Sequence, residues 1–313
     1  MASLAGRDLL SIADLSAAEI HEVLDTAAAV KAGADPGRPL AGRSLALVFQ
    51  RPSNRTRVSF EVAITRLGGH PIPLQHEELQ IGQRESTADV SRILARFVDG
   101  IVARLISHRD LVRMAEAAHC PVISAMTDRE HPCQLLADLL TLREQTGRLE
   151  GARVAYVGDG NNVCTSWLYA AALCGIDLRI VCPPGYEPPD DVLQRASTLR
   201  GGGELMLGHD PGPILRDADV VYTDVWTSMG QEAEQQRRRE DFVELQVNDD
   251  LLALAPTAKV MHCLPAHRGE EITDAVLDGP RSIVFDQAEN RMWAQLALLA
   301  LVYADVPAMS DGN

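Results

Sequence analysis

Short apolar runs alternate with amphipathic stretches along the first half of the chain. An apolar run bounded by turn residues is typical of a strand buried on both faces, and apolar residues at helical spacing are typical of a helix packed on such a sheet. The pattern predicts strands at Ser44–Phe49, Pro71–Gln75, Gly100–Leu105 and Pro121–Ser124, and helices at Ala17–Ala32, Arg55–Leu67, Ser86–Phe97 and Arg109–Ala118. Strands and helices in this alternation build a parallel, doubly wound sheet.

A longer helical pattern, Pro132–Thr146, ends at Gly147 and leads into a second series of strands with helices between them. These strands are expected at Val154–Val157, Leu178–Cys182, Glu204–Leu207, Val220–Thr223, Val260–Cys263 and Ile283–Phe285, and a last helix at Glu289–Val302. We therefore predict an α/β fold with two doubly wound parallel-sheet domains joined by a helix. The domains are expected at residues 1–145 and 146–289, with residues 290–313 packing back on the first. The charged run Gln235–Asp241 is expected on an exposed surface.

Length and charge narrow the class of protein. A chain of 313 residues suits two α/β domains of ordinary size, and an apolar fraction of 46% with 23% charged residues is typical of a soluble globular protein. The formal net charge of −15 argues against nucleic acid or an anionic membrane as a partner, because most of the surface would repel either. A site for an anion must therefore be a local basic pocket.

The cysteines and the apolar content of the two ends of the chain indicate the cellular compartment. The 6 cysteines form no Cys-x-x-Cys pair, and a chain of this size needs no disulfide for stability. Reduced thiols are expected, as in a cytoplasmic protein. The N-terminus lacks the apolar core of a signal peptide, and Met292–Ala304 is too short to span a bilayer. We expect neither export nor membrane insertion.

The stretch Ser53–Glu61 is a candidate anion cradle. It follows the Ser44–Phe49 strand and opens a helical pattern, so free backbone N–H groups and a helix dipole meet hydroxyl and guanidinium groups there. Pro52 fixes the turn, and Ser53 can cap the helix while its hydroxyl faces the same pocket as Arg55. The alternative is an ordinary capped helix whose arginines are solvated.

Further polar residues fall at the carboxyl ends of predicted strands, where open α/β sheets bind ligands. Arg104 lies near the end of the Gly100–Leu105 strand, and His131 and Gln134 stand where the linking helix begins. Taken singly, each is also typical of a surface ion pair or a helix-start turn. Together with Ser53–Arg57 they form a set of guanidinium, imidazole, amide and hydroxyl groups that suits an anion attached to a carbonyl.

The second series carries different chemistry at its strand ends. Tyr156–Val163 superficially resembles a dinucleotide fingerprint but lacks its glycine spacing, which argues against nicotinamide binding. Asp224 ends a strand and can bind an ammonium group, and the turn at Ser228–Gly230 can bind a carboxylate through its N–H groups. The alternative is capping and turn chemistry. For Cys263 the default is a small, buried apolar side chain.

Seven short motifs occur in one order across nearly the whole chain. They are S-N-R-T-R from Ser53, the single Arg104, H-P-C-Q from His131, G-D-G-N-N from Gly158, D-V-W-T-S-M-G from Asp224, H-C-L-P-A-H-R-G from His262 and A-E-N-R from Ala288. This ordered set resembles the ornithine carbamoyltransferases. The Ser-Met-Gly and His-Cys-Leu-Pro motifs resemble the ornithine enzymes rather than their aspartate-using relatives.

The resemblance implies that the first domain binds carbamoyl phosphate and the second L-ornithine, giving L-citrulline and phosphate in arginine biosynthesis. It assigns catalytic roles to Arg104, His131, Cys263 and Arg291. The residues implied to bind carbamoyl phosphate are Ser53, Asn54, Arg55, Thr56, Gln80, Arg104, His131, Gln134, Cys263, Leu264 and Arg291. Those implied to bind ornithine are Asn162, Asp224, Ser228 and Met229. The resemblance implies no metal and no organic cofactor.

The segment Glu77–Glu85 is polar, contains Gly82 and is expected to be a flexible loop. In the family that it resembles, Gln80 reaches into the phosphate site of a neighbouring subunit, within a homotrimer that has shared active sites. The alternative is a disordered surface loop.

Two positions depart from the family pattern: Asn54 replaces a threonine or another small residue, and Ser124 replaces a common asparagine. Asn54 is expected to bind phosphate through its backbone N–H. A carbamoyltransferase acting on another diamino acid and a non-catalytic, ligand-binding paralogue stay open as alternatives. The intact Arg55, Arg104 and His131 argue against the second.

Overall fold

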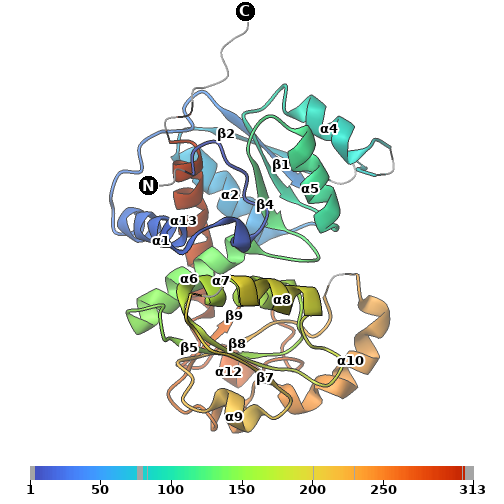
Figure 1. Ribbon diagram of the computed structural model, residues 1–313. Coiled ribbons are helices and arrows are strands. Elements are labelled where there is room, and N and C mark those ends of the chain that lie inside the picture. Colours follow the sequence, from blue (N-terminus) through green and yellow to red (C-terminus); the bar gives the residue numbers. More distant parts are fainter. Residues whose placement is uncertain are drawn as a thin grey trace, which may run out of the picture. The chain divides into compact units, whose positions relative to one another are not determined.

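The computed structural model describes residues 4–75, 80–82, 84–199, 201–228, 230–304 and 306. Their contacts divide the chain into two compact units (Figure 1): the chain up to Leu140 together with the residues from Asn290 on, and the stretch Thr141–Glu289. Each unit contains a parallel sheet with flanking helices. The predicted α/β class with two parallel sheets is therefore confirmed.

The sheet of the first unit has the strand order β2-β1-β3-β4. Its strands are β1 (Ser44–Phe49), β2 (His70–Gln75), β3 (Gly100–Arg104) and β4 (Val122–Met126). The helices of this unit are η1 (Ile12–Asp14), α1 (Ala17–Lys31), α2 (Asn54–Arg66), α4 (Thr87–Leu94), α5 (His108–Ala117) and α6 (Pro132–Thr146). Helix α6 continues into the second unit. The winding reverses between β1 and β3, where Phe49 pairs with Arg104. Ligands of open α/β sheets bind at the carboxyl ends of such a strand pair.

The sheet of the second unit has the order β7-β6-β5-β8-β9. Its strands are β5 (Arg153–Val157), β6 (Asp177–Val181), β7 (Leu205–Gly208), β8 (Val220–Thr223) and β9 (Lys259–His262). Its helices are α7 (Asn162–Cys174), α8 (Asp190–Thr198), α9 (Pro211–Leu215), η2 (Glu232–Glu234), α10 (Gln235–Phe242), η3 (Val243–Leu245), α11 (Asp249–Leu252), α12 (Asp274–Leu277) and the first residues of α13 (Val284–Val302). Here the winding reverses between β5 and β8, where Val157 pairs with Thr223.

The predicted strand Ile283–Phe285 is wrong. Ser282 makes a single parallel bridge with Val260 of β9, and α13 begins at Val284. The Gln287 N–H donates to the Ile283 carbonyl at 2.9 Å, which is helical spacing. Val284 is fully buried while Phe285 is 66% exposed. A short apolar run fits a buried strand and a helix start equally well, and periodicity alone does not separate them.

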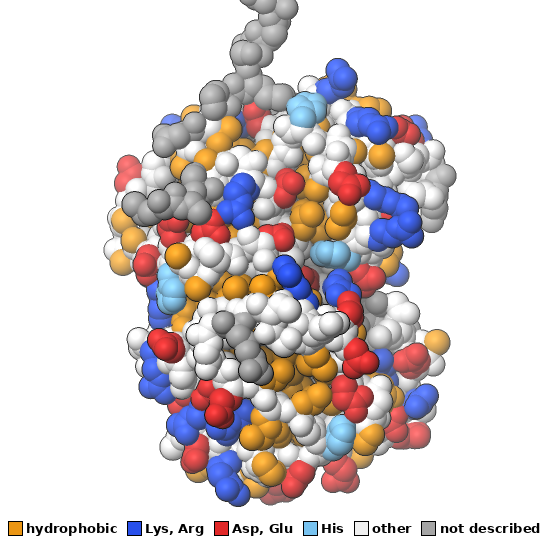
Figure 2. Space-filling model, in the orientation of Figure 1, with side chains coloured by type: hydrophobic (Ala, Val, Ile, Leu, Met, Phe, Trp, Pro, Cys, Tyr) orange, Lys and Arg blue, Asp and Glu red, His pale blue; other side chains and the backbone are white. Residues whose placement is uncertain are grey.

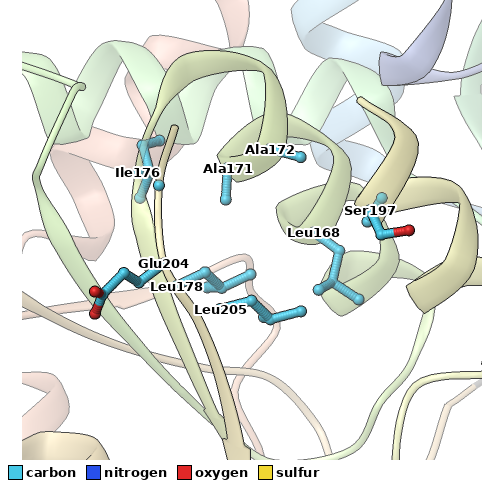
Figure 3. A pocket seen from close by; sticks show the side chains of 10 residues that line it. Leu168, Ala171, Ala172, Ile176, Leu178, Ser197, Glu204 and Leu205 are labelled. Carbon is cyan, nitrogen blue, oxygen red and sulfur yellow. The ribbon is translucent and has the colours of Figure 1, made fainter. Parts of the chain in front are cut away.

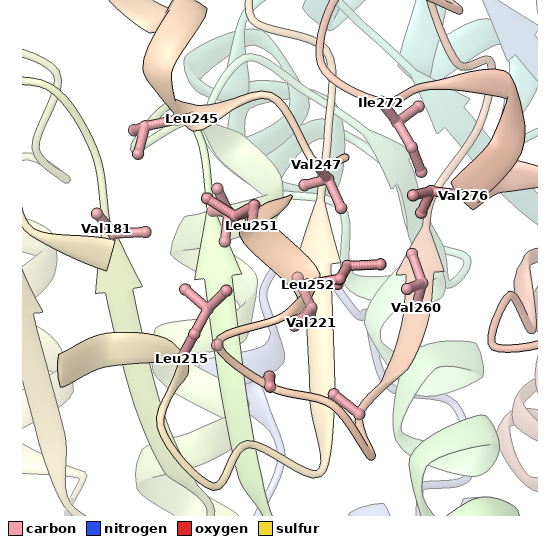
Figure 4. Close-up of a cluster of buried hydrophobic side chains, with 14 of the residues drawn as sticks. Val181, Leu215, Val221, Leu245, Val247, Leu251, Leu252, Val260, Ile272 and Val276 are labelled. Carbon is pink, nitrogen blue, oxygen red and sulfur yellow. The ribbon is translucent and has the colours of Figure 1, made fainter. Parts of the chain in front are cut away.

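Each unit has its own buried apolar core. In the second unit Val221 of β8 and Val260 of β9 pack with Val247, Leu251 and Leu252 (Figure 4). The core of the first unit contains apolar side chains from β1, β3 and α5, among them Val48, Ile101 and Leu111. Apolar burial stabilises by roughly 25 cal/mol per Å². These cores hold the strand ends in register.

A stack of aromatic rings supports the strand pair at which the second sheet reverses. The rings of Tyr156 on β5 and Tyr222 on β8 lie 5.6 Å apart at an interplanar angle of 14°, and Trp167 of α7 meets Tyr222 edge-on at 5.4 Å. All three side chains are fully buried. The stack therefore fixes β5, β8 and α7 relative to one another at the polar end of these strands.

A small cavity of ≈ 40 Å³ lies beside α7, α8 and β7 in the second unit (Figure 3). Its lining is mostly apolar, including Leu168, Ile176 and Leu178, with Ser197 and Glu204 as polar residues. Pockets for small-molecule ligands usually enclose about 300–1,000 Å³. The cavity is therefore a gap in the packing rather than a substrate site.

Acidic and basic side chains are mixed over the face of the protein shown in Figure 2. Within the described part of the chain, we find no helix with both the length and the apolar character needed to cross a membrane.

Gly203, just before β7, packs against backbone. A Cβ at this position would lie 2.1 Å from the Ile176 carbonyl oxygen, so Gly203→Ala must displace β7 from its neighbour. We expect the substitution to lower the free energy of unfolding by about 1–3 kcal/mol, as overpacking does. Gly208→Ala is the matched control, because its Cβ would meet Ile214 at 3.8 Å, an ordinary contact. Urea denaturation would test this, and equal losses for both variants would contradict it.

Candidate functional site

The first group of polar residues surrounds the N-terminus of α2. Ser53 is the N-cap residue, and its hydroxyl accepts from the Thr56 N–H at 3.4 Å and donates to the Thr56 hydroxyl at 3.0 Å. Asn54 is the first residue of the helix and is exposed. The first N–H groups of a helix have no partners inside the helix, and the helix dipole favours negative charge beside them. The capped turn thus offers N–H groups that suit an anion, on a protein whose net charge is −15.

Arg291 joins this group from α13. Its Nη2 donates to the Thr56 hydroxyl at 2.6 Å, and Thr56 and Arg291 are 0% and 3% exposed. The Nε of Arg55 is buried and has no hydrogen-bond partner among the described residues. Arg104 ends β3, is 8% exposed, and follows a shift in the pairing of β3 with β4. Two of these three arginines are thus buried at the end of the sheet.

His131 is buried among these cations, immediately before α6. Its pKa lies well below the usual value of 6.5, first because burial disfavours the charged ring and then because Arg291, Arg104 and Arg55 repel a further positive charge. The imidazole is therefore neutral at physiological pH. The structure brings together the sequence-predicted residues Arg55, Arg104, His131 and Arg291, which combine fixed positive charge with a neutral imidazole.

Gln134 stands in the first turn of α6, where its N–H donates to the His131 carbonyl at 3.1 Å. Its side chain is buried, and Nε2 donates to Asp138 Oδ1 at 2.8 Å. The helix therefore places the amide beside the imidazole-bearing turn.

Asp224 follows β8 in the second unit and is 6% exposed. Its Oδ2 accepts from Asn161 Nδ2 at 2.8 Å, and its Oδ1 accepts from the Val225 N–H at 2.8 Å and from Cys263 Sγ at 2.9 Å. Asn161 is oriented by the stacked Tyr156, whose hydroxyl donates to Asn161 Oδ1 at 3.0 Å. The carboxylate is therefore held in one position by groups from three strand ends.

Sequence reasoning named Asn162 as a site residue and did not name its neighbour Asn161, which donates to Asp224. Asn161 is the N-cap of α7 and accepts from the N–H groups of Val163 and Cys164, whereas Asn162 is the first residue of the helix. The signal was present, because asparagine after a glycine turn is a preferred helix cap.

Cys263 and Leu264 belong to the turn after β9. His262 controls this turn: its Nδ1 accepts from the Leu264 N–H at 2.8 Å, and its Nε2 lies 3.0 Å from Glu271 Oε1. Because Nδ1 accepts, Nε2 carries the proton and donates to Glu271. Leu264 has a φ of +57°, a left-handed conformation that this hydrogen bond helps to hold. The Cys263 thiol is half-buried and lies against Asp224.

Asp224, His262 and Cys263 also place potential metal-ligand atoms within 4.8 Å of one another. Both ring nitrogens of His262 already take part in hydrogen bonds within the protein. The hydrogen-bond network accounts for the cluster without an ion.

Arg238 is a second residue that sequence reasoning missed, because it lies in the charged run expected on the surface. It is 6% exposed, so the expectation is wrong for this residue. Its Nη1 donates to the Trp226 carbonyl at 2.9 Å and lies 3.0 Å from Asp159 Oδ2. Burial raises the pKa of Asp159 to about 6, although the charge of Arg238 acts in the opposite direction. Arg238 thus ties the turn after β5 to the segment that follows Asp224.

For the remaining site residues predicted from the sequence, the structure shows fewer contacts. The Ser228 N–H donates to Gln231 Oε1 at 3.1 Å, in the segment beyond Asp224. Gln80 is exposed, has a φ of +43°, and accepts from the Arg84 N–H through its carbonyl at 2.9 Å. Met229 lies outside the described residues.

Both units match domains of one protein family. Residues 7–144 match the carbamoyl-P binding domain of aspartate/ornithine carbamoyltransferases, and residues 150–302 match the Asp/Orn binding domain. The chain is 50% identical over 310 residues to the anabolic ornithine carbamoyltransferase of Pyrococcus furiosus, covering 97% of this chain and 98% of that protein. It is 51% identical over 300 residues to the ornithine carbamoyltransferase of Acidothermus cellulolyticus, covering 95% and 96%.

Solved structures agree with the sequence comparisons. Ornithine carbamoyltransferase from Pyrococcus furiosus superposes with a TM-score of 0.91 at 50% identity, covering 98% of this chain and all of that one. The anabolic enzyme from Campylobacter jejuni superposes with a TM-score of 0.90 at 34% identity, covering 95% and 98%. The similarity extends over both units.

The charge state of His131 is open to direct measurement. We expect its ring ¹³C signal to show no protonation step between about pH 8 and pH 6, because burial and three cations hold its pKa below the usual value of about 6.5. Arg291→Met removes one of these cations and should raise the pKa of His131. Arg57→Met is the matched control, because Arg57 pairs with Glu61 and does not contribute to the shift. A wild-type midpoint near the usual value would refute this.

Proposed function

We propose that this chain, which belongs to the aspartate/ornithine carbamoyltransferase family, transfers the carbamoyl group of carbamoyl phosphate to the side-chain amine of L-ornithine, giving L-citrulline and phosphate. The observation that carries the proposal is the neutral His131 among three arginines, in the unit that matches a carbamoyl-P binding domain. The relatives named above are carbamoyltransferases, and their similarity to this chain covers nearly their whole length. This protein is therefore a carbamoyltransferase as well.

The phosphate of carbamoyl phosphate would lie at the N-terminus of α2. Free N–H groups there, including that of Asn54, together with the Ser53 and Thr56 hydroxyls, suit phosphate oxygens. Arg55 adds a guanidinium that can bind two phosphate oxygens. Since the protein carries a net charge of −15, this local concentration of cations is what would attract a dianion.

The carbamoyl oxygen would face Arg104, Arg291 and His131. The ornithine amine attacks the carbamoyl carbon with its lone pair, the carbonyl π electrons move to oxygen, and a tetrahedral oxyanion forms. Fixed cations and a neutral imidazole N–H directed at that oxygen stabilise the developing charge. The carbonyl then re-forms as the bond from carbon to the phosphate oxygen breaks, phosphate leaves with that electron pair, and the surplus proton on the attacking nitrogen passes to the departing phosphate. No step requires a metal or an organic cofactor.

The second unit would hold the amino acid. Asp224 would bind the α-ammonium group, and Asn162, Ser228 and Met229 would surround the α-carboxylate. Cys263 and Leu264 would lie beside the side-chain amine and, with Gln80, complete the carbamoyl phosphate contacts. The reference pKa of such an amine is about 10.4, so it must lose a proton before it attacks. Nearby cations and desolvation both favour the neutral amine.

The direct test is a citrulline assay with purified protein, carbamoyl phosphate and a series of diamino acids. We expect L-ornithine to be turned over far faster than 2,4-diaminobutyrate or lysine, because the amine must reach the carbamoyl carbon while the α-groups stay bound. Turnover of a shorter diamine in preference to ornithine would reassign the acceptor. No product with any amine would overturn the proposal.

We also propose a cytoplasmic homotrimer with shared sites. Ile93 on α4 and Phe97 just beyond it are one helical turn apart and are 45% and 72% exposed. Large apolar side chains that gather on a surface are typical of contacts between subunits. Gln80 of one subunit would then reach the phosphate site of the next.

Arg104→Gln should lower kcat by on the order of a hundredfold or more while the protein stays folded, because the oxyanion loses a charged donor. Arg113→Gln is the matched control, since Arg113 is a half-exposed arginine on α5 that pairs with Asp110. Steady-state kinetics with circular dichroism would decide. Near-wild-type turnover of Arg104→Gln would remove Arg104 from the reaction.

Mixing an Arg55→Ala chain with a Gln80→Ala chain tests the shared site. Each variant alone should be inactive, but random reassembly should restore about a quarter of the sites, because a site then receives both intact residues from two chains. The activity of the mixture after unfolding and refolding together is the measurement. Two trimeric, inactive variants that never complement each other would exclude shared sites, as would a monomer that keeps full activity at dilution.

A further inference from the structure

We infer that Asp138 is a positioning residue that makes the first unit select carbamoyl phosphate over acyl phosphates of the same shape, by fixing which end of the Gln134 amide faces the ligand. The inference rests on the proposed function and deepens it. Asp138 is a buried acid that the transfer reaction described above does not use.

The geometry consists of one hydrogen bond and one open acceptor. Gln134 and Asp138 lie one turn apart on α6 and are 1% and 0% exposed. Gln134 Nε2 donates to Asp138 Oδ1 at 2.8 Å. Gln134 Oε1 is also buried, yet it has no hydrogen-bond partner among the described residues.

The two ends of an amide differ in hydrogen-bond chemistry. A carboxylate only accepts hydrogen bonds, so it binds the NH₂ end of the glutamine and leaves the carbonyl oxygen for another group. A buried carbonyl oxygen without a donor is destabilising, and the site therefore favours a ligand that supplies an N–H. Asp138 thus determines that Gln134 presents an acceptor and not a donor.

Carbamoyl phosphate supplies that donor, because its carbamoyl group carries an NH₂. Acetyl phosphate has a methyl group at the same position and cannot donate. A site built around a hydrogen bond rejects an analogue that lacks the group much more strongly than an apolar pocket rejects a change of size. The backbone N–H of Gln134 donates to the His131 carbonyl, so the two residues are neighbours at the start of α6, and the proposed function assigns both to the carbamoyl phosphate site.

The test measures binding to the full-length protein without ornithine, by calorimetry, for carbamoyl phosphate, acetyl phosphate and inorganic phosphate. Asp138→Asn keeps the shape but offers Gln134 a donor as well as an acceptor, so the amide can turn over. We expect its affinity for carbamoyl phosphate to fall about tenfold or more, as when a buried hydrogen bond is lost and its groups stay unpaired. Its affinities for acetyl phosphate and phosphate should change by less than about twofold, because neither ligand contacts the open acceptor.

Two further variants separate positioning from a structural role. In a Gln134→Leu background, Asp138→Asn should not further change the ratio of the affinity for carbamoyl phosphate to that for acetyl phosphate. Glu144→Gln, an exchange of acid for amide at an exposed position of the same helix, should change none of the affinities. If Asp138→Asn does not fold, Asp138→Ser makes the same change with a smaller side chain, because its hydroxyl can donate as well as accept.

Equal weakening for all three ligands would show that Asp138 acts only in folding, and an unchanged preference for carbamoyl phosphate would show that it does not orient Gln134. Either result overturns the inference. If the wild-type protein makes citrulline while the variants keep their preference, the inference fails alone. If the wild-type protein neither prefers carbamoyl phosphate nor makes citrulline, the proposed function fails with it.

Discussion

Positive charge is concentrated around one buried imidazole in a chain whose net charge is −15. Burial lowers the pKa of His131, and Arg291, Arg104 and Arg55 lower it further. Positive charge held together in this way favours a negatively charged ligand. Three elements of the first unit bring these groups together: α2 contributes a capped N-terminus, β3 ends in Arg104, and α13 carries Arg291 to the Thr56 hydroxyl.

The second unit uses the same topological position for the opposite charge. Its sheet also reverses between two neighbouring strands, and Asp224 follows one of them while the Asn161 turn follows the other. Asn161 and Cys263 donate to the carboxylate, and stacked tyrosines hold Asn161 in place. Two parallel sheets of similar design thus present a cation-rich end and an acid-bearing end, as a reaction between an anionic donor and an amine requires.

Much of the fold and of the candidate site was predictable, because buried parallel strands appear as apolar runs and their carboxyl ends can be read directly. Arg104, His131 and Gln134 were singled out in this way as site residues, and that assignment stays a prediction. The strand at Ile283–Phe285 was wrong because a short apolar run does not distinguish a strand from a helix start. Arg238 was missed because its partner Asp159 is far away in the sequence, and an arginine in a charged run is exposed unless such a partner buries it.

The sequence by itself determined the α/β class, the positions of most strands and the chemical types available at their ends, since periodicity and turn residues are local properties. Only the tertiary structure decided which of those ends meet. Sheet order brings Arg104 beside the strand that precedes Ser53, and the return of α13 adds Arg291 to Thr56. It also decided that His131 is neutral and that Asn161 donates to Asp224. Charge state and hydrogen-bond partner depend on burial and on neighbours remote in the chain, which no local pattern contains.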